Sequence, residues 1–343
     1  MRARFMAKKS RICRVCGPCA TRGPFAALRG RDEERYKGPA LIRLVVTDMD
    51  NTLYPWVDYI VPAVEAMVDS VCRSTGFPRI RVVQALKKVY AKYESNEYPY
   101  ALQESSIYEA FPDFGSFDKL VIEPARAAFA EARRRYLRPF RGVPETLRAL
   151  KERGIPVVAL TDAPRNPAEY RVRWMRLDEH LTALFTLPGF KFPARKGERL
   201  IAPDIMRKDE RGDYRAACPV VELSRTHEKP DPRGLLRICR EQGVSPRETL
   251  VIGDSLHKDI AVARKVGALD CWAEYGTYVS REYRERLDII SATAITRRHA
   301  ASMFEGDSQR RPETSHALSG FAQVLDIVDA AKASGRRKLR AAS

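Results

Sequence analysis

Short apolar runs alternate with stretches of helical periodicity along most of the chain. The runs 44–46, 157–160 and 250–252 are built of Val, Leu, Ile and Ala, and each is short enough to be a buried strand. Further along the chain, such runs alternate with helix-like stretches of about 10 to 12 residues. This order predicts an α/β fold, a Rossmann-like, doubly wound parallel sheet with right-handed crossovers, built from residues 41–56 and 138–330.

A long helical block interrupts this alternation between the first and second apolar runs. Within residues 57–137, apolar side chains recur at three- and four-residue spacing, most clearly over 60–74 and 79–93, without a convincing strand pattern. A polar break at 94–103 divides the block. We therefore predict that residues 57–137 form an all-helical domain inserted into the α/β core.

Three further segments lie outside the main pattern. Residues 188–228 contain the turn-forming stretch Lys-Asp-Glu-Arg-Gly-Asp and are predicted to form a hairpin-like insertion beside the sheet edge. Residues 1–40 carry eleven Lys and Arg against three Asp and Glu, and residues 331–343 carry five against none. Most of the net charge of +17 therefore lies at the two ends, which we expect to be disordered basic extensions.

Polar side chains suited to phosphoryl transfer follow the predicted strands. Because the carboxyl ends of parallel strands meet at one edge of a sheet, these side chains should converge there. Carboxylates can hold Mg²⁺, and a hydroxyl and an ammonium can bind phosphoryl oxygens. Taken singly, each residue also has an ordinary explanation as a turn, a helix cap or a surface lysine. The residues that come after predicted strands are Asp48, Asp50, Thr52, Thr161, Asp254 and Asp259, and Lys229, just before a predicted helix, joins them.

Together, these segments resemble the motifs of the haloacid dehalogenase-like (HAD) superfamily. The resemblance implies that Asp48 attacks phosphorus to form an aspartyl-phosphate, and that Asp50 serves as general acid and then as base. The expected activity is that of a phosphoric monoester hydrolase acting on a small phosphorylated metabolite. The matching segments are Asp48-Met-Asp50-Asn-Thr52, Thr161, Lys229-Pro-Asp-Pro and Gly253-Asp254-Ser255 with Asp259.

The same resemblance assigns the supporting residues and the cofactor. Thr161 and Lys229 are expected to bind the phosphoryl group, and Thr52 is expected to brace the first loop. Asp259 would support Lys229 or the waters of the metal. The implied cofactor is Mg²⁺, and the implied ligands are Asp48, Asp50 through its carbonyl, and Asp254.

The helical insertion refines the expectation about the substrate. An insertion directly after the first motif resembles a C1-type cap, and Asp-Asn-Thr-Leu-Tyr-Pro at 50–55 is similar to the pyrimidine 5′-nucleotidase-like branch. That branch implies a nucleoside 5′-monophosphate as a candidate substrate. Packing inside the insertion or a solvated loop is the competing explanation for each specificity candidate. The candidates are Trp56, Tyr59, Tyr98, Tyr100, Arg165 and Asn166.

Other functions remain open at this point. A phosphomutase would use the same residues, whereas a haloacid dehalogenase needs neither a metal nor the second aspartate. A nucleic-acid-binding protein could use the basic ends, but the folded part has little excess positive charge, so nucleic acid is not the expected partner.

The chain has seven cysteines, three of them close together near the start of the sequence. Cys13, Cys16 and Cys19 could hold a metal with a fourth donor from elsewhere. We see no secretory pattern and no apolar run near the roughly 18 residues that span a bilayer, so a cytoplasmic protein without a membrane partner is expected. The oligomeric state is left open.

Overall fold

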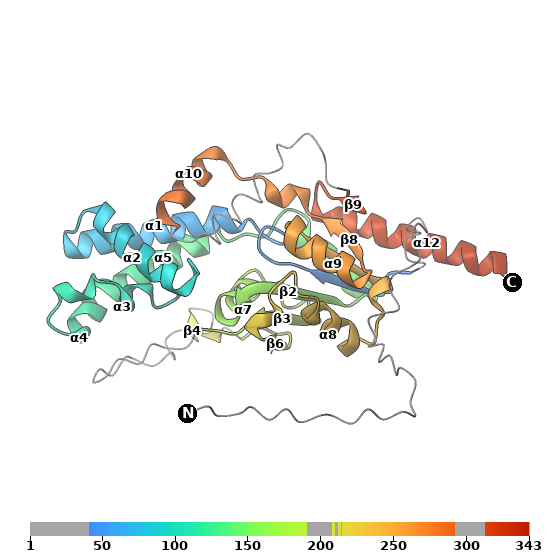
Figure 1. The fold of residues 1–343 in the computed structure, drawn as a ribbon, viewed down its shortest axis with the longest axis horizontal. Coiled ribbons are helices and arrows are strands. Elements are labelled where there is room, and N and C mark those ends of the chain that lie inside the picture. The colour runs from blue at the N-terminus through green and yellow to red at the C-terminus, as the bar shows by residue number, and fades with distance from the viewer. Residues whose placement is uncertain (1–40, 191–207, 210–211, 214, 292–312, 343) are drawn as a thin grey trace, which may run out of the picture. The chain divides into compact units, whose positions relative to one another are not determined.

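A parallel sheet forms the centre of the protein (Figure 1). The computed structural model describes residues 41–190, 208–209, 212–213, 215–291 and 313–342, and every structural statement below refers to these residues. Seven strands lie in the order β6-β3-β2-β1-β7-β8-β9, and every neighbouring pair is parallel. The strands are β1 Leu44–Thr47, β2 Val157–Pro164, β3 Ala183–Leu187, β6 Val220–Glu222, β7 Thr249–Gly253, β8 Leu269–Trp272 and β9 His316–Ala317. The predicted parallel sheet is thus confirmed.

Helices cover both faces of the sheet, because the central strands are apolar on both sides. Leu44 and Val46 of β1 belong to one buried cluster with residues of helices α8 (Arg233–Glu241) and α9 (Ala261–Val266). Val45, which points the other way, belongs to a second cluster with residues of α6, α7 and α12. The core helices are α6 Val143–Glu152, α7 Arg165–Trp174, α8 Arg233–Glu241, α9 Ala261–Val266, α10 Arg281–Ile290 and α12 Val324–Ala342, with short helical turns at Arg225–His227, Pro246–Glu248, Leu256–Ile260, Glu274–Thr277 and Phe321–Gln323.

Strand β1 marks the point where the order of the sheet reverses. From β1 the chain adds β2, β3 and β6 on one side, and it then returns to add β7, β8 and β9 on the other. Open parallel sheets bind ligands outside the carboxyl ends of their strands at such a point. The topology therefore places the residues that follow β1, β2 and β7 where a ligand site is expected.

The predicted insertion is helical throughout the segments that the structure assigns. Its first helix, α1 Trp56–Thr75, is capped by Gly76, whose left-handed backbone (φ 70°) lets its N–H bond to the carbonyl of Cys72. α1 packs mainly against α5, and α10 of the core lies against α1, where Arg286 donates to Glu65 at 2.6 Å. The elements are α1 Trp56–Thr75, α2 Arg79–Tyr93, α3 Ala101–Glu104, a 3₁₀ turn Tyr108–Ala110, α4 Phe114–Phe117, a π-helical turn Asp118–Ile122 and α5 Glu123–Tyr136.

The segment 188–228 differs from the expectation of a hairpin-like insertion. A short antiparallel hairpin exists, formed by β4 Lys208–Asp209 and β5 Gly212–Asp213. However, β6 follows it and pairs in parallel with β3, so the last part of the segment belongs to the main sheet. The β-branched pair Val220-Val221 suits such an edge strand, which is too short to be recognised from its pattern alone.

The expectation of a disordered tail from residue 331 is wrong. Helix α12 continues to Ala342. The stretch is rich in Ala, Lys and Arg, which favour helices, and its single glycine at 335 costs only about 1 kcal/mol. Within the described part of the chain, no helix is both long and apolar enough to cross a bilayer. Residues 1–40, with Cys13, Cys16 and Cys19, lie outside the described residues.

Candidate active site

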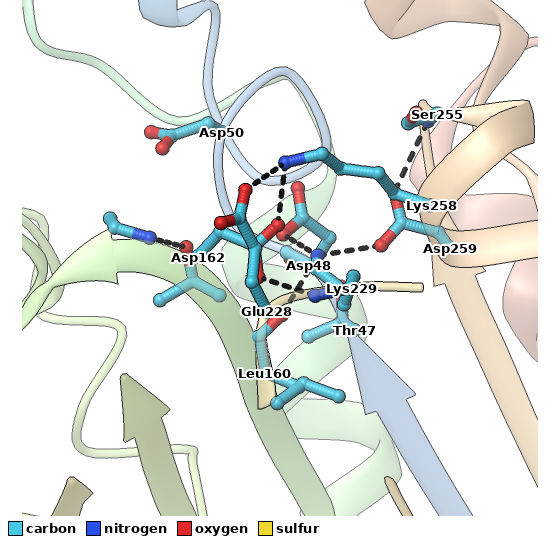
Figure 2. A network of polar contacts seen from close by, with 12 residues as sticks. Thr47, Asp48, Asp50, Leu160, Asp162, Glu228, Lys229, Ser255, Lys258 and Asp259 are labelled. Atoms are coloured by element: carbon cyan, nitrogen blue, oxygen red, sulfur yellow. Dashed lines mark hydrogen bonds and ion pairs between the residues drawn. The ribbon is translucent and has the colours of Figure 1, made fainter. Parts of the chain in front are cut away.

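Lys229 contacts Asp48 after β1, the backbone of Leu160 in β2, and Asp259 in the helical turn after β7 (Figure 2). Its ammonium donates to Oδ1 of Asp48 at 2.5 Å, to Oδ1 of Asp259 at 2.6 Å and to the carbonyl of Leu160 at 3.2 Å. The side chain is buried, and burial opposes its charge, but the neighbouring carboxylates, Asp259 first, outweigh this and raise the pKa of Lys229. A fixed, buried positive charge therefore stands beside the predicted nucleophile.

The backbone places Asp48 at this point. Asp48 follows β1, and its N–H donates to the carbonyl of Ile252 in β7 at 2.8 Å. Burial raises the pKa of Asp48 to about 8, opposed by Lys229 and reinforced by Asp259. Asp254, after β7, has a pKa raised by burial and then by Asp48 and Asp259. These carboxylates repel one another in a buried place, a state that a bound cation would relieve.

Three carboxylates form a group suited to a divalent cation. Oxygens of Asp48, Asp254 and Asp259 all lie within 4.8 Å of one another. Oxygen donors of this kind are preferred by Mg²⁺, which keeps several waters and needs few protein ligands. The donor set therefore fits the predicted metal.

Asp50 faces a different set of partners. Its carboxylate is turned away from the group formed by Asp48, Lys229 and Asp259 (Figure 2). Oδ1 of Asp50 accepts a hydrogen bond from the hydroxyl of Tyr54 at 2.5 Å and another from Arg171 at 2.7 Å. An acid must reach the leaving-group oxygen, which lies on the side of phosphorus opposite the nucleophile, so this orientation agrees with the predicted role.

The remaining predicted core residues adjoin the site along the chain, since Thr161 follows Leu160 and Thr52 lies two residues after Asp50. Thr161 is buried on β2, and its hydroxyl accepts a hydrogen bond from the N–H of Ala163 at 3.1 Å. Thr52 is buried, and its hydroxyl has no hydrogen-bond partner among the described residues. Its carbonyl accepts from the hydroxyl of Tyr275 at 2.6 Å, so Thr52 holds its loop through the backbone.

Two charged residues at the site were not expected from the sequence. Asp162 accepts from the N–H of Lys229 at 3.0 Å, which fixes the loop that carries the lysine. Lys258 donates to Oδ2 of Asp162 at 2.8 Å and to Oε1 of Glu228 at 2.9 Å. The sequence signal was present, since Asp162 directly follows Thr161 and Lys258 directly precedes Asp259.

Two glycines permit close packing at the site. A Cβ at Gly276 would overlap the carbonyl oxygen of Asn51 in the loop after β1. A Cβ at Gly253 would overlap the side chain of Asp259. Both positions therefore need glycine for space, not for backbone conformation.

The specificity candidates divide into two groups. Trp56 Nε1 and the Tyr59 hydroxyl both donate to Oε1 of Glu97 in the insertion, at 3.3 and 3.0 Å. Tyr98 and Tyr100 are buried, at 4% and 5% exposure, and Tyr59 is buried as well, at 1%. The contacts of these three tyrosines are those of packing within the protein, and contact with a substrate stays a prediction for them.

Of the two candidates on α7, only Arg165 carries a charge, and that charge is already paired. Arg165 is paired with Glu222 at 2.8 Å and with Glu169 at 3.3 Å. Asn166 is exposed, and its amide packs against Gly189 closely enough that a Cβ there would collide with it. An anionic group of a substrate would have to compete with the two glutamates for Arg165.

Replacing Tyr98 by Ala should destabilise the whole protein. The Tyr98 ring stacks on Tyr93 with centroids 3.6 Å apart, and its hydroxyl donates to Glu104. Losing a buried aromatic ring costs about 3–5 kcal/mol, which should lower Tm by roughly 5–10 °C. Activity on every substrate should fall alike. Tyr136→Ala, at a position 37% exposed, serves as the control and should leave Tm nearly unchanged. A normal Tm with altered substrate preference would contradict this.

The family model that matches the sequence covers most of the sheet and the whole insertion. Residues 42–267 match the haloacid dehalogenase-like hydrolases. The chain belongs to this family. The family predicted from the motifs is thus confirmed, whereas the C1-type cap and the pyrimidine 5′-nucleotidase-like branch stay predictions.

Several curated proteins similar to this chain are phosphatases. An N-acetylmuramic acid 6-phosphate phosphatase from Pseudomonas aeruginosa is 27% identical over 47% of this chain, and the match spans 57% of that relative. A glyceraldehyde 3-phosphate phosphatase from Methanopyrus kandleri is 25% identical over 73% of this chain and 91% of its own length. A phosphoglycolate phosphatase from Thiobacillus denitrificans is 27% identical over 69% of this chain and 86% of its own length. The enzyme class expected from the sequence agrees with these relatives.

Solved structures cover a larger share of the chain at lower identity. A 2-haloacid dehalogenase from Pseudomonas syringae pv. Tomato is 17% identical with a TM-score of 0.49, over 84% of this chain and 99% of that chain.

Proposed function

We propose that the chain is a Mg²⁺-dependent phosphomonoester hydrolase that acts on a small phosphorylated metabolite through an aspartyl-phosphate. The observation that supports this most is the buried Lys229, held between Asp48 and Asp259 where the strands end. A phosphoryl group beside Asp48 would bring several negative charges to one place. Lys229 supplies a fixed countercharge for them at the moment of attack.

The metal would be held by residues already close together. Asp48, Asp254 and the carbonyl of Asp50 are the proposed ligands, and Asp259 orients Lys229 and would support metal-bound water. When bound, Mg²⁺ would neutralise the phosphoryl oxygens and the nucleophile, so that one anion can attack another.

The reaction would then proceed by two successive displacements at phosphorus, in which Asp48 and Asp50 take part. In the first, an oxygen of Asp48 forms a bond to phosphorus while the ester P–O bond breaks, and the proton on Asp50 goes to the leaving oxygen. In the second, Asp50 takes a proton from water as the water oxygen attacks phosphorus. The bond between Asp48 and phosphorus breaks, which restores the carboxylate and releases inorganic phosphate.

We further propose that the helical insertion is a C1-type cap that selects the substrate. The support is the contact between Glu97 of the insertion and Arg171, which itself bonds to Asp50. An insertion in contact with the partner of the general acid can exclude water and meet the leaving group. The relatives act on phosphoglycolate, glyceraldehyde 3-phosphate and N-acetylmuramic acid 6-phosphate, and pyrimidine nucleoside 5′-monophosphates follow from the motif at 50–55.

A phosphate-release screen tests this function. The substrates are phosphoglycolate, sugar phosphates, triose phosphates and nucleoside 5′-monophosphates, each with Mg²⁺ and with excess chelator. We expect activity on at least one, abolished by the chelator and restored by Mg²⁺. Rearranged phosphate esters without free phosphate would indicate a phosphomutase. Halide release from a haloacid without metal would indicate a dehalogenase, which has no need of Asp50 or Asp254.

Asp50→Asn should slow hydrolysis by a factor that depends on the leaving group of the substrate. An amide cannot donate the proton, so hydrolysis of an alkyl phosphate should fall by about 10²- to 10⁴-fold. An activated aryl phosphate, whose leaving group needs no proton, should lose far less in its first step. The measurement is single-turnover kinetics with both substrates. Equal losses would remove Asp50 from the acid role while leaving Asp48 as nucleophile.

A further inference from the structure

Arg171 is an arginine almost wholly enclosed by the protein. It lies on α7, and its side chain is 2% exposed. One guanidinium nitrogen donates to Oδ1 of Asp50 at 2.7 Å and to the hydroxyl of Tyr54 at 3.1 Å, while the other pairs with Glu97. The chain therefore places one buried cation between a carboxylate of the β1–α1 loop and a carboxylate of the insertion.

Such an arrangement is costly unless every group in it is paired. Burial opposes the charge of Arg171, but Asp50 and then Tyr54 and Tyr59 outweigh this and raise the pKa of the guanidinium. The planar fork of an arginine can hold two acceptors at fixed angles, which a lysine cannot do. Glu97 is held in turn by Trp56 and Tyr59. The position of the guanidinium is therefore set from several sides.

The two hydrogen bonds to Asp50 both end on the same oxygen. Tyr54 and Arg171 each donate to Oδ1, and they also contact each other. With Oδ1 held at two points, the carboxylate plane is restricted and Oδ2 is the oxygen left to exchange a proton. Misplacing a catalytic group by about 1 Å can cost about 10²-fold in rate.

We propose that Arg171 is a positioning residue that fixes the carboxylate of Asp50 and makes this position depend on the docked insertion through Glu97. The proposal rests on the proposed function, in which Asp50 transfers the proton to the leaving oxygen. Arg171 thus connects the insertion to the step of proton transfer. A residue that only held the insertion in place would affect stability and substrate binding, but not the dependence on the leaving group.

The test compares an alkyl and an activated aryl phosphate in single-turnover assays. Arg171→Lys keeps the charge but loses the fork, so we expect the alkyl rate to fall about tenfold and the aryl rate by less than about threefold. Arg173→Lys is the matched control, since Arg173 lies on the same helix with a side chain 43% exposed. It should change neither rate. Equal losses on both substrates in Arg171→Lys would overturn the proposal.

A double-mutant cycle tests the positioning role of Arg171 separately from the proposed acid role of Asp50. If Arg171 acts through Asp50, Arg171→Lys should have almost no further effect on the alkyl rate in the Asp50→Asn background. Fully additive effects would show that Arg171 acts independently of Asp50. If Asp50→Asn alone shows no dependence on the leaving group, the acid role itself fails.

Substitution of Glu97 tests whether the insertion affects the position of Asp50. Glu97→Gln removes the charge that holds the second nitrogen of Arg171, so it should lower the alkyl rate more than the aryl rate. Glu104→Gln is the control, because Glu104 is a largely buried acid of the insertion bonded by Tyr93, Tyr98 and Lys92. It should lower Tm without changing the ratio of the two rates. The same change of ratio in both variants would mean that the insertion acts only through general stability.

Discussion

Asp48→Asn should abolish turnover while the protein stays folded. The amide has the shape of the carboxylate but cannot form the aspartyl-phosphate, so kcat should fall by at least about 10³-fold. Because the pKa of Asp48 is raised by burial, replacing the carboxylate also removes a charge that the interior disfavours. Tm should therefore stay the same or rise slightly in the absence of metal.

The measurement combines kcat with thermal unfolding and mass analysis. Mass analysis confirms that the asparagine has not reverted to aspartate by deamidation. A folded variant that retains more than a tenth of the wild-type kcat would remove Asp48 from its role. Covalent labelling of the wild type by a phosphoryl donor, absent in Asp48→Asn, would support the proposed intermediate directly.

Lys229→Met should impair both catalysis and stability. Its removal leaves Asp48 and Asp259 buried without their shared countercharge, and breaking such a buried pair costs about 3–5 kcal/mol. It also removes the fixed positive charge beside the phosphoryl group. We expect kcat/KM to fall by about 10²- to 10³-fold, with a clear drop in Tm.

Two further variants separate these effects. Lys229→Met combined with Asp259→Asn removes one charge of each sign, so it should regain part of the lost stability without regaining activity. Lys258→Met removes a lysine that bonds to Asp162 and Glu228, and it should cost less than about tenfold in kcat/KM. Near-normal activity of a folded Lys229→Met would contradict the role of Lys229 in phosphoryl binding.

The main site residues could be predicted because their signals are local. Each of β1, β2 and β7 contains a short apolar run, at 44–46, 157–160 and 250–252, and a polar residue of the motif comes one or two positions after that run. Parallel strands place such residues at one edge by a general rule of topology, so the amino-acid order alone was enough to group Asp48, Thr161 and Asp254. The helical insertion could also be predicted from the sequence, because the helical spacing of its apolar residues extends over long helices.

Several elements have no usable local pattern. Strands β6 and β9 have three and two residues, too few for a period to be detected, and only pairing with a longer neighbour defines them. The part of helix α12 from residue 331 onward was not predicted, for another reason. Its many positive charges suggested a solvated tail, while its helix-forming composition favoured continuation.

The sequence by itself determined the α/β order of the chain and the polar residue types that lie near its strand ends. It could not distinguish Arg171 from Arg173, two residues apart on one helix, of which one is 2% exposed and the other 43%. Their different roles come from partners 121 and 5 positions away in the chain, Asp50 and Asp178. Tertiary structure decides which guanidinium is buried, because only the folded chain brings Asp50 and Glu97 to the same side of α7.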